Sequence, residues 1–168
     1  MAVMNPMLNG RGILAAQYFL YFGVMGLFLP FFNLYCYQLG FSGWQIGALS
    51  ATRSVTMILF SIFWSLLADR FHARRWIYIA CNFVSAALWG LFLLTASFAW
   101  MLAITVAFGM FYAPLIAFLE AFAMEALGRD KKRYGRMRAW GSVAFIMVVL
   151  ALGRLIDAYG IKVILSVI

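Results

Sequence analysis

The sequence predicts an all-α protein that lies in a membrane, because of its composition and two long uncharged stretches. Hydrophobic residues make up 67% of the 168 residues and charged residues 11%, against about 45 to 50% and about 25% in soluble domains. No charge occurs from residue 12 to 52 or from 76 to 119. Each stretch is about twice the ~20 apolar residues that cross a bilayer as a helix. A soluble globular fold is therefore excluded.

Turn residues divide the sequence into five membrane-spanning helices. A Gly/Ser turn at 38–43 breaks the first stretch, and Thr95–Phe98 breaks the second. The predicted spans are 13–36, 45–68, 76–95, 100–127 and 134–156. The first apolar run is longer than a signal-peptide core, so we interpret it as a retained span. A sixth apolar segment begins at Lys162 and stops at Ile168, too few residues to cross at about 1.5 Å each.

These spans predict the organisation and orientation of the chain. We expect residues 1–11 to be a cytoplasmic N-terminus and residues 12–168 to be an N-terminal transmembrane bundle, truncated in helix six. The basic loop residues fall in the second and fourth loops and not in the first and third: Arg70, Arg74, Arg75, Arg129, Lys131, Lys132, Arg133 and Arg136. By the positive-inside rule these loops and Arg11 face the cytoplasm of the cell (inner) membrane. The net charge of +8 thus reports topology rather than nucleic-acid binding.

Glu120 and Arg138 are the strongest candidates for a functional pair. An ionisable residue inside a membrane span is costly, which suggests a function by default. The midpoint of the two is residue 129, in the turn between their spans, so an antiparallel hairpin places them at one depth. Each charge also faces the unfavourable end of its own helix dipole, and an ion pair would offset both costs. A purely structural staple is the alternative. Pro114, earlier on the span of Glu120, is expected to bend that helix.

Arg53 also lies well inside a span, about 12 Å from the membrane face. Its span 45–68 contains no carboxylate. Gly47, Ser54 and Ser61 follow at heptad spacing and predict a tight packing face on this helix. Arg53 is therefore either a structural tie to neighbouring helices or part of a solute pathway. Weaker candidates for a cavity wall are polar residues of the first span, Gln17, Tyr18, Tyr21 and Asn33.

The sequence carries no motif of an enzyme or metalloprotein. It has no HExxH, no paired His/Cys spacing and no Gly-rich phosphate loop, and its single histidine, His72, lies in a loop. Cys36 and Cys81 are expected near opposite membrane faces, farther apart than the ~5.5 Å between Cα atoms that a disulfide needs. We therefore expect no enzymatic activity, no cofactor and no metal.

Three segments resemble the major facilitator superfamily, in the branch of lactose permease-like sugar/proton symporters and phenylpropionate permease-like transporters. They are Tyr18–Phe32, Ser65–Arg70 and Tyr134–Ser142, and the likeness covers nearly the whole chain from about residue 12. The lactose permease-like pattern implies that Glu120 and Arg138 bind substrate. The phenylpropionate-like branch is similar in having an arginine on helix two, which matches Arg53.

The loop after the second span departs from the superfamily pattern Gly-x-Leu-x-Asp-Arg-x-Gly-Arg-Arg. Asp69, Arg70 and Arg74 match it, and the resemblance implies that they help to latch a cytoplasmic gate. Ser65 stands for the first glycine, and His72 and Ala73 stand for the Gly-Arg. The geometry of the latch is therefore left open.

The function implied by this resemblance is secondary active transport, as a proton-coupled symporter of a small organic solute such as a sugar or an organic acid. Such transporters work by alternating access between two bundles. The expected partners are the solute, a proton, the lipid bilayer and a C-terminal bundle of the same polypeptide, without nucleic acid. The alternatives are a non-transporting membrane scaffold, a truncated remnant, or a half-size transporter acting as a homodimer.

Overall fold

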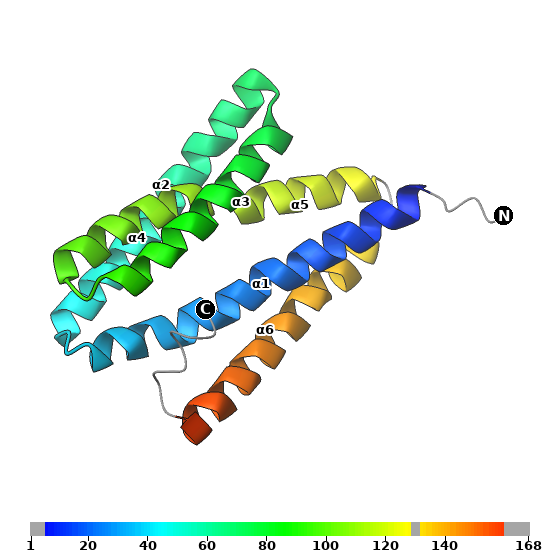
Figure 1. Cartoon of the computed structure of the whole chain (residues 1–168). Helices are drawn as coiled ribbons and strands as arrows, with labels where there is room; N and C mark the ends of the chain where they lie inside the picture. Colours follow the sequence, from blue (N-terminus) through cyan, green and yellow to red (C-terminus); the bar gives the residue numbers. More distant parts are fainter. Residues whose placement is uncertain (1–5, 129–131, 160–168) are drawn as a thin grey trace. The chain divides into compact units, whose positions relative to one another are not determined.

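The computed structural model describes residues 6–128 and 132–159 (Figure 1). Their elements are six α-helices and one short 3-10 helix: α1 (Pro6–Gln38), α2 (Gly43–Phe71), α3 (Arg74–Gly90), η1 (Leu91–Leu94), α4 (Phe98–Tyr112), α5 (Pro114–Leu127) and α6 (Lys132–Tyr159). The predicted all-α fold is confirmed. The expected sixth segment, from Lys162 to Ile168, lies outside the described residues, as do Arg129 and Lys131 of the fourth loop.

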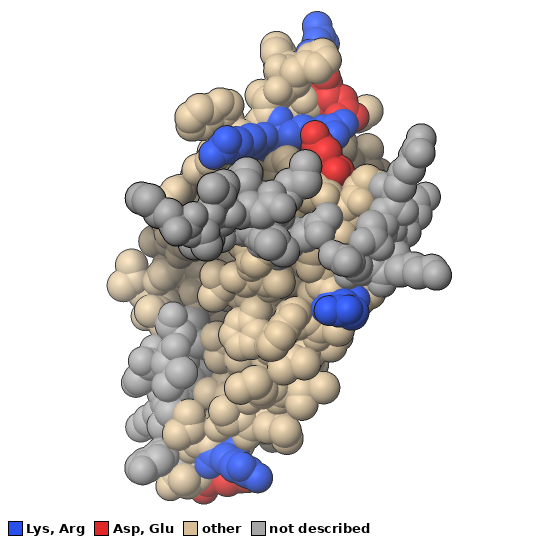
Figure 2. All heavy atoms as spheres, turned by 90° about the vertical axis from the view of Figure 1, so that its right-hand side faces the viewer, with Lys and Arg blue, Asp and Glu red and all other residues tan. Residues whose placement is uncertain are grey.

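Five segments are long and apolar enough to cross a membrane: Gly12–Gln38, Gly43–Phe71, Arg74–Leu94, Phe98–Leu127 and Tyr134–Ala158. They coincide with the five predicted spans to within a few residues at each end. The face in Figure 2 is mostly uncharged between small groups of charged side chains, which fits a surface in contact with lipid. The chain is a multi-pass membrane protein.

The chain divides into two compact units, which are described separately. The first unit comprises Met1–Tyr35 and Leu119–Ile168, and the second comprises Cys36–Phe118. The first contains most of α1, the second half of α5, and α6. The second contains α2, α3, η1, α4 and the start of α5.

The predicted turn between the first two spans is built as the sequence suggests. Gly40 adopts a φ of 83°, a left-handed conformation that glycine takes without steric cost. The N–H of Phe41 donates to the carbonyl of Cys36 at 3.1 Å and closes the end of α1. Ser42 then begins α2 with a capping box, in which its hydroxyl and the side chain of Gln45 each accept a backbone N–H. Local residue types alone determine this turn.

Close contact between α2 and α4 forms the core of the second unit. Gly109 of α4 lies against Thr56 of α2, where a Cβ on the glycine would come within 2.9 Å of Thr56 Cγ2. The hydroxyl of Thr56 donates to the carbonyl of Thr52 at 2.7 Å, so this hydroxyl is hydrogen-bonded within its own helix. Gly47 and Ser54, from the predicted packing face, are exposed in the described structure. Thr56, which lies on nearly the opposite face of α2, packs on α4 instead.

Pro114 interrupts the fourth span between α4 and α5, as expected from its missing N–H. The carbonyl of Met110, four residues earlier, therefore has no helical donor. Trp64 of α2 fills this gap, because its indole Nε1–H donates to the Met110 carbonyl at 2.8 Å. The Trp64 ring also packs against Phe111, with ring centroids 5.8 Å apart. A side chain from a neighbouring helix thus completes the backbone hydrogen bonding of the broken one.

Within the first unit, α1 and α6 run side by side in close contact (Figure 1). A Cβ on Gly26 would lie 3.1 Å from the carbonyl oxygen of Phe145, and one on Gly23 would lie 3.8 Å from Val148. Gly141 of α6 in turn lies against the ring of Phe22. Small residues at a helix contact are typical of membrane proteins, where close van der Waals packing replaces the hydrophobic effect.

Candidate functional site

Glu120 and Arg138 form the predicted ion pair between α5 and α6. Arg138 Nε lies 3.6 Å from Glu120 Oε1, a distance that allows charge attraction but is too long for a good hydrogen bond. α5 is followed by Gly128, which has a left-handed φ of 53°. The N–H of Gly128 donates to the carbonyl of Met124 at 3.1 Å and closes the end of this helix. The Glu120 and Arg138 side chains are 41% and 48% exposed in this chain, so the pair is open on one side.

Tyr134 also belongs to this cluster, although sequence reasoning missed it. Its hydroxyl donates to Glu120 Oε1 at 3.3 Å. Tyr134 precedes Arg138 by four residues on α6, a spacing that places both side chains on one helix face. That spacing is the signal that could have identified it. Glu120 is therefore approached by a cation and a hydroxyl from successive turns of α6.

Tyr18 of α1 adds a second hydroxyl at the same place. The residue has 0% exposure, and its hydroxyl has no hydrogen-bond partner of acceptable geometry within the described part of the chain. Tyr134, Glu120 and Arg138 are its electrostatic neighbours. The Tyr134 hydroxyl is near enough to interact with it as a hydrogen-bonding group, so the two tyrosines form one cluster with the ion pair. Among the weaker sequence candidates, Tyr18 is the one that the structure brings to the ion pair.

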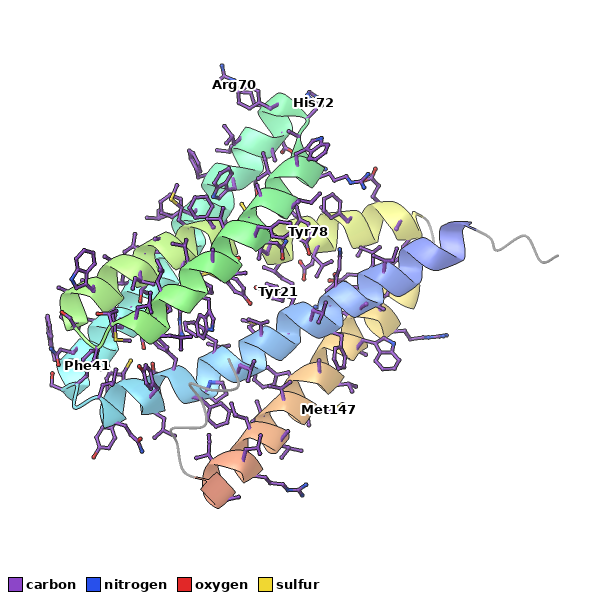
Figure 3. The ribbon with its side chains drawn as sticks, viewed as in Figure 1. Tyr21, Phe41, Arg70, His72, Tyr78 and Met147 are labelled. Atoms are coloured by element: carbon purple, nitrogen blue, oxygen red, sulfur yellow. The ribbon has the colours of Figure 1, made fainter. Side chains whose placement is uncertain are left out.

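Phe22, one turn after Tyr18 on α1, borders the ion pair. The Arg138 guanidinium carbon lies 5.6 Å from the centroid of the Phe22 ring, within the range of a cation–π contact. Tyr21, whose backbone is on the same turn, is buried and is labelled in Figure 3. Of the remaining first-span candidates, Gln17 and Asn33 are half-buried.

Arg53 belongs to the second unit, whereas Glu120 and Arg138 belong to the first. Its residue surface is half-buried, and its Nη1 atom is shielded from solvent. This interior place agrees with either role expected from the sequence. A role of Arg53 in a solute pathway stays a prediction.

The expected gate residues lie at the α2–α3 loop of the second unit. Arg74 Nε donates to Asp69 Oδ1 at 3.0 Å, and Arg74 Nη2 donates to the same oxygen, so an exposed ion pair bridges the two helix ends. Arg70 is also exposed, with its guanidinium 5.9 Å from the Phe71 ring centroid. Figure 3 shows Arg70 and His72 together at the end of α2.

His72 adopts a backbone conformation that glycine favours. It ends α2 in the left-handed conformation, with a φ of 52°, and it stands where the superfamily pattern has glycine. Ala73 follows and donates its N–H to the carbonyl of Ala68 at 3.3 Å. The turn therefore keeps the geometry that glycine would give, at the steric cost of a side chain in a left-handed position.

The chain has long apolar helices, a helix broken at proline and a Glu–Arg pair within two of the membrane-length helices. These features define a class of protein, helical membrane proteins with charged residues inside their spans. A sequence profile described as the MFS_1 like family matches residues 12–168. The chain belongs to this family of the major facilitator superfamily.

Named relatives are membrane transporters, which points away from an enzyme. A probable 3-phenylpropionic acid transporter of Escherichia coli is 30% identical over 91% of this chain and 40% of its own length. A maltose permease of Geobacillus stearothermophilus is 28% identical over 88% of this chain and 38% of its own. A crystal structure of a mutant of the nucleoside transporter NupG shares the fold, with a TM-score of 0.85 at 20% identity, over 94% of this chain and 40% of that one. The chain thus spans about two fifths of these proteins.

Proposed function

We propose that this chain is part of a secondary transporter that moves a small organic solute by alternating access. Glu120 and Arg138 contact the solute in this proposal. The observation that carries it is the cluster of that ion pair with Tyr134 and the buried hydroxyl of Tyr18. Family membership and the transporter relatives support the same function.

A small organic acid is the solute class that we favour. The contact of Arg138 with Glu120 runs through Nε at 3.6 Å, and the guanidinium carbon lies over the Phe22 ring, 5.6 Å from its centroid. A solute carboxylate could therefore take a bidentate contact with Arg138, which such pairs prefer. A sugar is the second candidate, because a hydroxyl between Glu120 and Arg138 could donate to one and accept from the other.

Coupling, assembly and location complete the proposal. We expect protons to drive transport, with Arg53 lining the pathway and Asp69, Arg70 and Arg74 latching the cytoplasmic gate. The protein would lie in the cell (inner) membrane with its N-terminus in the cytoplasm. The relatives are about two and a half times as long as the matched region, so transport would need a second bundle in addition to this one, from the same polypeptide or from a second copy.

Uptake by the complete gene product tests this function. Cells that express it would be given radiolabelled 3-phenylpropionate, maltose or uridine, with and without a protonophore. Uptake of one probe should exceed that of cells without the gene, and the protonophore should abolish it. Uptake of no probe would count against this solute range, and uptake that survives the protonophore would count against proton coupling.

The site is tested by Glu120→Gln and Arg138→Ala. We expect each to reduce uptake about tenfold or more, because a hydrogen bond to a charged group contributes about 1.5–3 kcal/mol, while the amount of protein in the membrane is unchanged. Matched controls are Glu125→Gln and Arg136→Ala, exposed residues on the same two helices, which should keep normal uptake. Normal uptake by both site variants would mean that the pair is structural.

A further inference from the structure

We propose that Phe22 is a positioning residue that presents the Arg138 guanidinium to a carboxylate, and that Gly141 makes this possible by leaving room for the ring. This inference rests on the proposed function, and it narrows the solute to one with a carboxylate. Phe22 touches the arginine rather than the solute. Its effect is to determine how the guanidinium is oriented.

Gly141 admits the Phe22 ring beside Arg138. The two α6 residues are three positions apart, so they lie on one helix face. A Cβ on Gly141 would overlap Phe22 Cδ2 and would lie 2.9 Å from Phe22 Cγ. Any other residue at 141 would therefore displace the ring that lies 5.6 Å from the Arg138 guanidinium carbon.

Two tyrosines of α1 hold the ring from its own helix. The Tyr18 ring is nearly parallel to Phe22, at 17° and 6.4 Å between centroids. The Tyr21 ring meets Phe22 edge-on, at 82° and 5.4 Å. Stacked and edge-to-face arrangements are the favourable geometries for aromatic pairs. Phe22 is thus fixed by aromatic neighbours and by Gly141 of the facing helix.

The guanidinium is then held at two points. Its carbon lies over the Phe22 ring, 5.6 Å from the ring centroid, and Glu120 attracts its Nε at 3.6 Å. Because a guanidinium is planar and rigid, these two contacts fix the direction of its Nη1 and Nη2 donors. That fork matches the two oxygens of a carboxylate, which a lysine cannot reproduce. Pre-orientation of the fork reduces the entropy that is lost when the solute binds.

The first measurement is the reactivity of Arg138 toward phenylglyoxal, which needs no transported solute. The purified complete gene product would be treated with phenylglyoxal, and modification of Arg138 would be followed by peptide mass spectrometry relative to Arg136. Phe22→Leu should raise the Arg138 rate roughly threefold to tenfold, since it removes a cation–π contact of a partly buried cation. Phe22→Tyr, which keeps an aromatic ring, should leave the rate of Arg138 modification at the wild-type value. Phe83→Leu, at an exposed site on α3, is the matched control and should change nothing.

Gly141→Ala is the second variant, in which the ring is displaced but not removed. It should raise the Arg138 rate as Phe22→Leu does, and the double variant should be no more reactive than either single one. If the wild type transports 3-phenylpropionate, Phe22→Leu should raise its KM with little change in kcat, whereas transport of maltose or uridine alone would overturn the assignment of a carboxylate. An unchanged Arg138 rate in both folded single variants would overturn the proposal. Absence of uptake in the wild type would instead contradict the proposed function, and the phenylglyoxal rates would still decide the role of Phe22.

Discussion

At the residue scale, the site differs most from expectation at Tyr18. The sequence marks it only as a polar residue on an apolar helix, whereas the structure buries it completely next to Tyr134, Glu120 and Arg138. Its ring stacks on Phe22, and its hydroxyl lies beside that of Tyr134. Removal of a hydroxyl that contacts the solute should weaken solute binding without lowering the stability of the protein.

Tyr18→Phe tests this distinction. We expect the thermal stability of the protein in detergent to be unchanged or slightly higher, since the hydroxyl forms no hydrogen bond of acceptable geometry in the described structure. We expect KM for the transported probe to rise roughly fivefold to tenfold, because the variant loses one hydrogen bond to the solute. Tyr134→Phe is the comparison, because it removes a bond to Glu120 and should lower stability by about 1 kcal/mol. A loss of stability in Tyr18→Phe with normal KM would assign its hydroxyl a structural role.

At the element scale, the break at Pro114 depends on a residue far away in the sequence. Trp64 supplies the hydrogen bond that the proline removes from Met110, so α2 and α4 are joined by a polar contact within an apolar interface. In lipid no water can replace that donor. The break is therefore stable only while α2 is in place.

A double-mutant cycle tests this dependence. Trp64→Phe should reduce stability by about 1–3 kcal/mol, since it leaves the Met110 carbonyl without a donor. In a Pro114→Ala background the cost should be smaller by about 1 kcal/mol, because the restored N–H of residue 114 can bond to Met110. Unfolding in detergent, followed by circular dichroism, measures each corner of the cycle. Equal costs of Trp64→Phe in both backgrounds would mean that only the packing of the indole matters.

At the scale of the whole molecule, the charges of the loops predict an orientation in the membrane. The α2–α3 loop region carries Arg70, Arg74 and Arg75, whereas the α1–α2 turn at 38–43 is uncharged. The positive-inside rule assigns the first of these to the cytoplasm and the second to the outside. The α2–α3 loop would then be on the side where a cytoplasmic gate must close.

Cysteine labelling tests this orientation. In intact cells, a membrane-impermeant maleimide should label Ser42→Cys and should label Ala73→Cys only after permeabilisation. The native Cys36 and Cys81 are buried, so wild type is the control and should remain nearly unlabelled. Labelling of Ala73→Cys, and not Ser42→Cys, from outside would reverse the orientation.

The sequence by itself determined the spans, the turns and the ion pair. Hydropathy is a local property, so the uncharged stretches alone locate five helices to within a few residues. The same is true of Gly40 and Ser42, whose backbone preferences require no distant partner. Glu120 and Arg138 were predictable because a hairpin of two helices fixes equal depth by counting along the chain.

Only the tertiary structure decided which helix faces meet. The donor from Trp64 to Met110 joins residues 46 positions apart, and the contact of Phe22 with Arg138 and Gly141 joins α1 to α6. In a chain with 67% hydrophobic residues, nearly every face of a helix is apolar, so periodicity does not distinguish a face that meets lipid from one that meets protein. Steric fit selects the face. The absence of a side chain at Gly141 leaves a gap in the surface of α6, and the ring of Phe22 fills that gap.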